Sequence, residues 1–139
     1  MKDYVLDANA VIRYFEGESG DGREKVQSLF EQSRHGNARL FMSAVNMGEV
    51  LYIFLKRIGQ QRAMHYIQQL QHAVSFIGVD TAQTIHAATL KHRYNLGYAD
   101  SYAAALTIET RATLVSADPS FEKLGKVLKW LKLPRHRPS

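Results

Sequence analysis

The stretch YVLDANAVIRYF, residues 4–15, decides the class of fold, because a short apolar run ends directly on an acid, Asp7. The run before Asp7 has the apolar character of a buried strand. An acid in this place either caps the helix that follows or has a chemical role. The rest of the chain bears on which of the two interpretations holds.

Three more stretches have the composition of buried strands: LFMS at 40–43, VSFIGV at 74–79 and ATLVS at 112–116. Helical spacing and capping signals predict five helices after the first strand and its helix. The first ends at Gly36, and the others span Ser43 to Gly59, 60–73, Asp80 to Tyr94 and 98–111. Strands that alternate with helices predict an α/β fold with a central, mostly parallel sheet flanked by helices.

The segment 126–132 fits two structures. KVLKWL has the composition of an edge strand, whereas Leu124, Val127, Leu128 and Leu131 also have helical spacing, so both alternatives stay open. We expect one domain over residues 1–133. The last residues, 134–139, are basic and polar, and we expect them to form a flexible tail.

Composition limits the classes of function. The chain has 139 residues, 45% of them apolar, which fits one domain with a substantial core. The absence of cysteine excludes disulfides, thiolate metal sites and cysteine nucleophiles. No apolar run approaches the roughly 20 residues that span a bilayer, and the first residues lack the pattern of a secretory leader. We therefore expect a soluble, cytoplasmic protein without a membrane partner.

Four acids lack a nearby cation that would explain them. Most of the 13 Asp and Glu residues have a Lys or Arg beside them or three or four positions away. Asp7, Glu49, Asp100 and Asp118 instead lie among apolar or small residues. Three of them can serve at helix amino termini. Glu49 is different, because its helix is predicted to be apolar nearly all round, where an unpaired acid is costly to bury.

The predicted fold brings these four acids together. In parallel α/β sheets, ligands bind beyond the carboxyl ends of the strands, where helix amino termini also lie. Asp7 and Asp118 each follow a predicted strand, and Glu49 and Asp100 lie near the starts of their helices. Four clustered carboxylates repel one another unless a cation lies among them, and hard oxygen donors suit Mg²⁺ or Mn²⁺.

The net charge favours a phosphodiester substrate for such a site. The formal charge is +5, and setting the four acids aside leaves 13 − 4 = 9 acids against 18 Lys and Arg. An acidic site in basic surroundings can hold a metal and a polyanion at the same time.

Four fragments resemble, in order and separation, the motifs of the PIN-domain nucleases, and more narrowly those of the VapC-like toxins of toxin–antitoxin pairs. The fragments are YVLDANAVI, SAVNMGEVLY, YADSYAAAL and LVSADPSF, and the resemblance runs from Tyr4 to Trp130. It implies a three-layer PIN-like sandwich. It also implies a divalent-metal-dependent endoribonuclease, commonly a homodimer, that is silenced by a cognate antitoxin protein.

The resemblance assigns roles residue by residue. The metal-binding and catalytic acids are Asp7, Glu49, Asp100 and Asp118, and the polar residues beside them are Asn9, Ser116 and Ser43. The consecutive helices at 43–58 and 60–73 carry more apolar side chains than a domain of this size covers. Part of that pair is therefore expected to stay exposed, as an interface for a second copy and an antitoxin.

Other functions are kept as alternatives. A PIN-like domain that binds nucleic acid or a partner without cutting it is one, although the four acids argue against it. Phosphatases of the haloacid-dehalogenase type should show Asp-x-Asp-x-Thr where this chain has DANAV, so they fit poorly. The identity of the RNA and the number of metal ions stay open.

Overall fold

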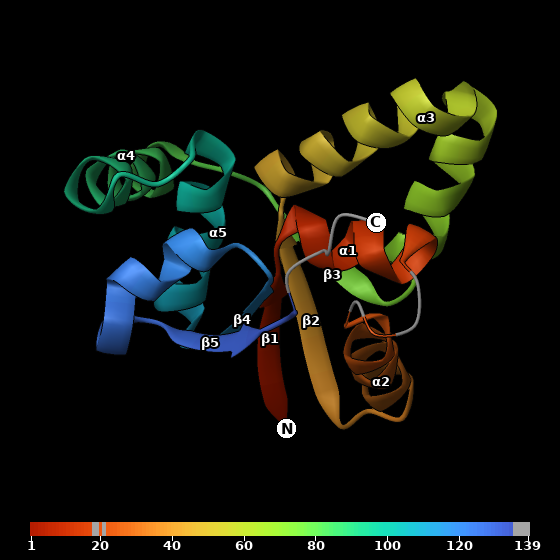
Figure 1. The fold of residues 1–139 in the computed structure, drawn as a ribbon, viewed down its shortest axis with the longest axis horizontal. Helices are drawn as coiled ribbons and strands as arrows, with labels where there is room; N and C mark the ends of the chain where they lie inside the picture. Colours follow the sequence, from red (N-terminus) through yellow and green to blue (C-terminus); the bar gives the residue numbers. More distant parts are fainter. Residues whose placement is uncertain (18–19, 21, 135–139) are drawn as a thin grey trace.

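The structure, a computed structural model, describes residues 1–17, 20 and 22–134. Its strands are β1 (Lys2–Leu6), β2 (Ala38–Ser43), β3 (Val74–Ile77), β4 (Thr113–Ser116) and β5 (Lys129–Lys132). Its helices are α1 (Ala8–Glu16), α2 (Arg23–Arg34), α3 (Ala44–Gln71), α4 (Thr81–Tyr94), α5 (Tyr98–Thr110) and the 3-10 segment η1 (Pro119–Val127). The predicted alternation of strands and helices is confirmed (Figure 1). Apart from Pro134, the predicted basic tail lies outside the described residues.

All five strands form one sheet in the order β3-β2-β1-β4-β5. Every neighbouring pair is parallel, so the prediction of a mostly parallel sheet is confirmed. β1 lies in the middle of the sheet, between β2 and β4. Because the strands all run in one direction, their carboxyl ends meet at a single edge, and this edge positions the candidate site.

Helices cover both faces of the sheet and make three layers. Successive strand side chains point to opposite faces, and Leu6 packs into one core while Val5 packs into the other. Val115 and Leu114 of β4 divide in the same way. Figure 1 shows α1 and α2 on one side of the sheet and α4 and α5 on the other. Both faces are therefore buried, as a parallel sheet requires.

The long helix α3 bends at Gly59, whose φ of 81° and ψ of 169° are not helical. Glycine adopts positive φ without the steric cost of a side chain. The predicted boundary at Gly59, with a second helix after it, is confirmed as two halves of α3 that meet at a sharp bend (Figure 1). Among the described ranges, no helix is long and apolar enough to cross a membrane.

The structure resolves the segment 126–132 into a short strand. η1 ends at Val127, and β5 pairs with β4 so that Trp130 lies opposite Leu114 and Lys132 opposite Ser116. Leu128 is buried in the core beneath α5. Pairing with the otherwise open edge of β4 satisfies backbone groups that a helix at this point would leave exposed.

Candidate active site

The four acids reach the carboxyl edge of the sheet from four elements. Asp7 follows β1 directly, and Asp118 comes two residues after β4. Glu49 lies in the second turn of α3, which begins where β2 ends, and Asp100 lies in the first turn of α5. The parallel sheet therefore places side chains that are far apart in the chain near one another.

Asp7 is almost fully buried and holds three hydrogen bonds. Its Oδ1 accepts from the backbone N–H of Ala8 at 2.9 Å, so Asp7 caps α1 as expected. Its Oδ2 accepts from Asn9 Nδ2 at 2.9 Å and from the Ser116 hydroxyl at 2.8 Å. One carboxylate oxygen thus serves the helix cap, and the other is oriented by two side chains.

Asn9 and Ser116 connect the ends of β1 and β4. Asn9 Nδ2 also lies 3.0 Å from Ser116 Oγ, and Asn9 Oδ1 accepts from the backbone N–H of Ala117 at 2.9 Å. Ser116 Oγ in turn accepts from the backbone N–H of Asp118 at 3.0 Å. The structure therefore places four of the predicted residues, Asp7, Asn9, Ser116 and Asp118, in one hydrogen-bonded group.

The environment of Asp7 disfavours its charge. The pKa of the Asp7 carboxyl is raised from 3.8 to about 6, chiefly by burial and also by the negative charges of Glu49 and Asp118. The hydrogen bonds from Ser116 and Ala8 act in the opposite direction and lower it. An opposite charge near Asp7 would relieve both the desolvation and the repulsion.

The Asp100 carboxylate lies against the backbone of Gly97 at the start of α5. A side-chain carbon added at Gly97 would lie 3.0 Å from Asp100 Oδ2, so glycine at this position leaves room for the carboxylate. Burial, the charge of Asp7 and a hydrogen bond shared with Asp118 together raise the pKa of Asp100 to about 8, and burial is the largest cause. At neutral pH without a cation, Asp100 is mainly protonated.

Asp118 is the member of the group that keeps its charge most easily. Its Oδ1 accepts from the backbone N–H of Ser120 at 2.9 Å, which caps η1, with Pro119 in the first position. Burial acts to raise the pKa of Asp118, but hydrogen bonds from Asp100 and Ser120 and the charge of Lys123 bring it below its ordinary value. Asp100 and Asp118 therefore share one proton unequally, as coupled carboxyl pairs do.

The helix that carries Glu49, predicted to be apolar nearly all round and partly exposed, has one buried face and one exposed face, and Glu49 lies on the exposed one. Val50 and Phe54 of α3 are buried, but Glu49 is exposed and Tyr52, one turn later, keeps 60% of its surface. Only one face of α3 meets the core. Partial burial still raises the pKa of Glu49, and its charge raises those of Asp7 and Asp100, so it belongs to the same electrostatic group.

Capping explains where Asp7 and Asp118 lie along the chain, and the first turn of α5 favours an acid at Asp100, but neither effect explains why the acids converge. The charges of Glu49 and Asp118 raise the pKa values of both Asp7 and Asp100, and the charge of Asp7 raises that of Asp100, which costs free energy in the folded state. In the described part of the chain, no three acid or histidine side chains are already arranged to chelate an ion. Movement of side chains, chiefly of the exposed Glu49, would be needed to close such a site.

Ser43 stands apart from this group. It is fully buried, and its hydroxyl accepts from the backbone N–H of Val45 at 3.2 Å, which confirms it as the cap of α3. None of the hydrogen bonds found for Ser43 reaches an acid.

Two residues near the acids, Lys123 and Asn46, are not predicted from the sequence. Lys123 lowers the pKa of Asp118 and donates to the Asn95 carbonyl oxygen at 3.3 Å. Asn46 is fully buried and bonds to the Ala99 carbonyl oxygen at 3.1 Å. The sequence does contain a signal for Asn46, because it is a polar residue in an apolar stretch one turn before Glu49. No feature of the sequence indicates that Lys123 lies near the acids.

A well-formed hollow of the described surface lies away from the acids. A hollow of about 680 Å³ lies over the second half of α3, lined by Gln60, Gln61, Arg62, Met64, His65 and Gln68. It contains no carboxylate and lies on a different part of the molecule from the carboxyl edge. Electrostatic strain among the acids, rather than depth of the surface, identifies the candidate active site.

The chain matches known proteins at the level of family and of fold. The family model for the PIN domain matches residues 4–127, which is most of the chain. No curated protein sequence matches it.

Solved structures with the same fold include toxin–antitoxin proteins. VapBC2 from Rickettsia felis, bound to a DNA fragment from its promoter, superposes with a TM-score of 0.74 at 16% identity and covers 94% of this chain and 98% of that chain. DNA-bound VapBC from Salmonella typhimurium gives a TM-score of 0.74 at 17% identity, with coverage of 95% and 98%. VapC20 from Mycobacterium tuberculosis, a toxin that cleaves the sarcin-ricin loop, gives 0.66 at 17%, with coverage of 88% and 95%.

Proposed function

The chain belongs to the PIN domain family, and from this premise we propose that it is a divalent-metal-dependent endoribonuclease and the toxin of a toxin–antitoxin pair. Its reaction is hydrolysis of an RNA phosphodiester bond. Its catalytic and metal-binding residues are Asp7, Glu49, Asp100 and Asp118.

The observation that carries this proposal is the set of raised pKa values at the carboxyl edge. Asp7 reaches about 6 and Asp100 about 8, with like charges among the causes in both cases. A protein gains nothing in stability from such crowding. Perturbed carboxyl groups gathered at the ligand-binding edge of a parallel sheet are typical of a functional site.

The donor set fits Mg²⁺ or Mn²⁺. All four acids offer hard oxygen ligands, and the chain contains no cysteine that would favour a softer metal. Asp7, Asp100 and Asp118 would hold the cation, and Glu49 would complete the set from its exposed position on α3. A cation among them would also neutralise the repulsion that raises their pKa values.

The chain's own side chains then have distinct tasks. The chemistry that a divalent cation supplies in such sites is polarisation of the phosphoryl oxygen and a lower pKa for the attacking water. Asn9 and Ser116 hold Oδ2 of Asp7 in a fixed orientation. Asp118, whose pKa is lowered, would bind a cation as the ionised carboxylate, and Asp100 would have to be deprotonated to serve as a ligand beside it.

RNA is the proposed substrate because of charge. Outside the four acids, the chain has 9 acids and 18 Lys and Arg, which suits a polyanion. Lys123 lies close enough to Asp118 to lower its pKa and would contact a phosphate at the edge of the site. One of the structural neighbours, VapC20, is a toxin that cleaves the sarcin-ricin loop, and this activity agrees with the proposed substrate class.

A second copy and an antitoxin are the proposed protein partners, and the exposed face of α3 supports them. Glu49, Tyr52 and Leu55 follow one another at three-residue spacing, so they share one face of the helix, and all three are exposed. The apolar part of this face can pack against a helix, while a basic side chain of that partner reaches Glu49. Several structural neighbours are toxin–antitoxin complexes.

Cleavage of single-stranded RNA by the purified protein tests the proposal. We expect cleavage with Mg²⁺ or Mn²⁺, none after chelation, and recovery when the metal is restored. Asp100→Asn should abolish cleavage but retain RNA binding. Asp80→Asn is the matched control, because Asp80 also caps a helix, with Oδ1 accepting from Gln83 N–H at 2.8 Å, but lies outside the acid group.

Two results would contradict the proposal. Cleavage that persists after thorough chelation would exclude the metal mechanism. RNA binding without cleavage under every metal condition would favour the alternative of a PIN-like domain that binds nucleic acid without cutting it.

A further inference from the structure

Asn46 has a buried oxygen without a hydrogen-bond partner. The residue lies in the first turn of α3 and is completely buried. Its Nδ2 donates to the carbonyl oxygen of Ala99 at 3.1 Å, whereas its Oδ1 has no partner among the described residues. The amide nitrogen of Asn46 therefore has a hydrogen bond in the described structure, and the amide oxygen has none.

Such an arrangement is costly. A buried acceptor left without a partner loses its hydrogen bonds to water and gains none in return, whereas an apolar side chain at the same place would avoid that penalty. Few buried polar groups in proteins lack partners, so each exception calls for a reason. The hydrogen bond donated by Nδ2 of Asn46 must therefore have an effect that an apolar side chain could not provide.

The bond made by that half joins the two helices that carry Glu49 and Asp100. Asn46 precedes Glu49 by three residues, so the two lie on neighbouring positions of one helical face. Ala99 directly precedes Asp100 in the first turn of α5. α3 and α5 pack against one another. The bond from Asn46 to Ala99 fixes the relative position of the two helices at the ends that carry the acids.

We propose that Asn46 is a positioning residue that sets the separation of Glu49 and Asp100 through its bond to the Ala99 carbonyl oxygen. This inference rests on the proposed metal-dependent function. Among the described residues, no other side-chain hydrogen bond links the turn of α3 that carries Glu49 to the first turn of α5. Loss of the bond lets the two carboxyl groups drift apart without unfolding the protein.

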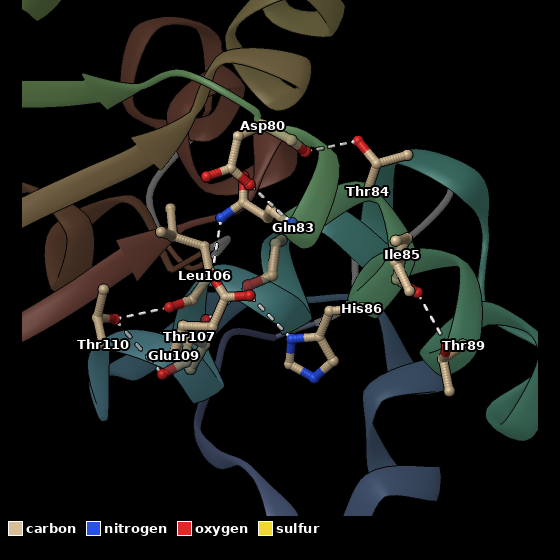
Figure 2. Close-up of polar contacts among 11 residues, drawn as sticks. Asp80, Gln83, Thr84, Ile85, His86, Thr89, Leu106, Thr107, Glu109 and Thr110 are labelled. Carbon is tan, nitrogen blue, oxygen red and sulfur yellow. Dashed lines mark hydrogen bonds and ion pairs between the residues drawn. The ribbon is translucent and has the colours of Figure 1, made fainter.

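Gln83 provides a matched comparison within the same chain. Gln83 of α4 is also a buried amide whose Oε1 finds no partner in the part of the chain that the structure describes, and its Nε2 donates to Glu109 Oε2 in α5 at 3.0 Å. Figure 2 shows this contact, with His86 on the other oxygen of Glu109. It joins α4 to the far end of α5, away from the acids. Any general effect of deleting a buried interhelical amide should appear in both places.

The experiment titrates metal-free protein with Mn²⁺ in a calorimeter and compares Asn46→Ala, Asn46→Leu and Gln83→Ala with the wild type. Asn46→Ala removes the amide, and Asn46→Leu removes it while filling the space. Loss of a residue that orients metal ligands typically lowers metal affinity about 10–100-fold. We expect that loss in both Asn46 variants and none in Gln83→Ala, with similar urea unfolding of Asn46→Ala and Gln83→Ala in chelator.

Steady-state kinetics supply a second readout. The Asn46 variants should lower kcat with KM for RNA nearly unchanged, since the residue touches neither the surface nor the substrate. Mn²⁺ affinity equal to that of the wild type in either folded variant overturns the inference. Failure of both Asn46 variants to fold while Gln83→Ala folds also overturns it and makes Asn46 purely structural. A wild type that binds no Mn²⁺ instead overturns the proposed function.

Discussion

The hydroxyl of Ser116 donates to Oδ2 of Asp7 across 109 residues of sequence, at 2.8 Å and in a fully buried setting. The bond joins the carboxyl ends of β1 and β4, which are neighbours in the sheet. The same oxygen of Ser116 accepts from Asn9 and from the backbone of Asp118. Ser116 is therefore the centre of the hydrogen-bonded half of the site, and its removal has consequences for both stability and activity.

Ser116→Ala should destabilise the protein and reduce cleavage. The hydrogen bond from Ser116 lowers the pKa of Asp7, so its loss should raise that pKa further and weaken metal binding. Hydrogen bonds to charged groups contribute about 1.5–3 kcal/mol, and we expect a loss of that order in urea unfolding near neutral pH. Thr107→Val is the control, because the buried Thr107 hydroxyl bonds only within α5, to Ala103. Equal effects of the two changes would argue against a special role for Ser116.

The metal-free protein should become less stable as pH rises from about 4 to about 8. The folded-state pKa values of Asp7, about 6, and Asp100, about 8, lie above their ordinary value of 3.8. Each therefore stabilises the fold while protonated, and that contribution is lost as pH rises through the folded-state pKa. For the buried Asp7, a rise from 3.8 to about 6 corresponds to about 3 kcal/mol. Asp118 has a lowered pKa and acts in the opposite sense, at pH below about 4.

Urea unfolding in chelator at a series of pH values measures this dependence. Asp100→Asn should remove the slope between about pH 6 and 8 and reduce the slope between about pH 4 and 6, where Asp7 continues to contribute. Saturating Mg²⁺ should flatten the profile in the wild type, because the bound cation favours the ionised acids. Stability that is constant or rises over this range in metal-free wild type would contradict the assigned pKa values.

Lys123→Gln should weaken RNA binding in a salt-dependent manner. If Lys123 contacts a phosphate beside Asp118, its loss should reduce the slope of log affinity against log salt by about 0.7, the value for one contact to a single strand. Lys2→Gln is the control, since Lys2 begins β1 at the opposite edge of the sheet. Fluorescence anisotropy across a salt series gives both slopes. An unchanged slope in Lys123→Gln would place its contact elsewhere.

Tyr52→Glu should disrupt self-association and antitoxin binding without unfolding the protein. Tyr52 keeps 60% of its surface exposed on the face of α3 that also carries Glu49 and Leu55, so the change should cost little stability. Sedimentation should show a dimer for the wild type at tens of micromolar and a monomer for the variant. Ile85→Glu is the control, because Ile85 on α4 is 63% exposed but lies away from α3. Identical behaviour of the wild type and Tyr52→Glu would remove α3 from the interface.

Much of the fold and part of the site could be predicted because the signals are local. Apolar runs mark four of the five strands, Gly59 marks the bend of α3, and Asp80 caps α4 as its spacing to Gln83 indicates. The parallel arrangement then requires that residues following the strands meet at one edge. Asp7 and Asp118 can be placed together on that ground alone, although their metal-binding role stays a prediction.

The remaining features depend on contacts that no local pattern contains. Residues 129–132 form a strand only because β4 offers an unpaired edge, since the same segment has helical spacing. Glu49 is exposed because one face of α3 meets the core and the other meets solvent, which the evenly apolar sequence around it conceals. Asn46 finds the carbonyl oxygen of Ala99 only when α3 and α5 pack. The sequence by itself determined the first four strands, the helices between them and the acids that follow β1 and β4, because those features depend on neighbouring residues. Tertiary structure decided burial, pairing and the pKa of each acid, because these depend on partners far along the chain.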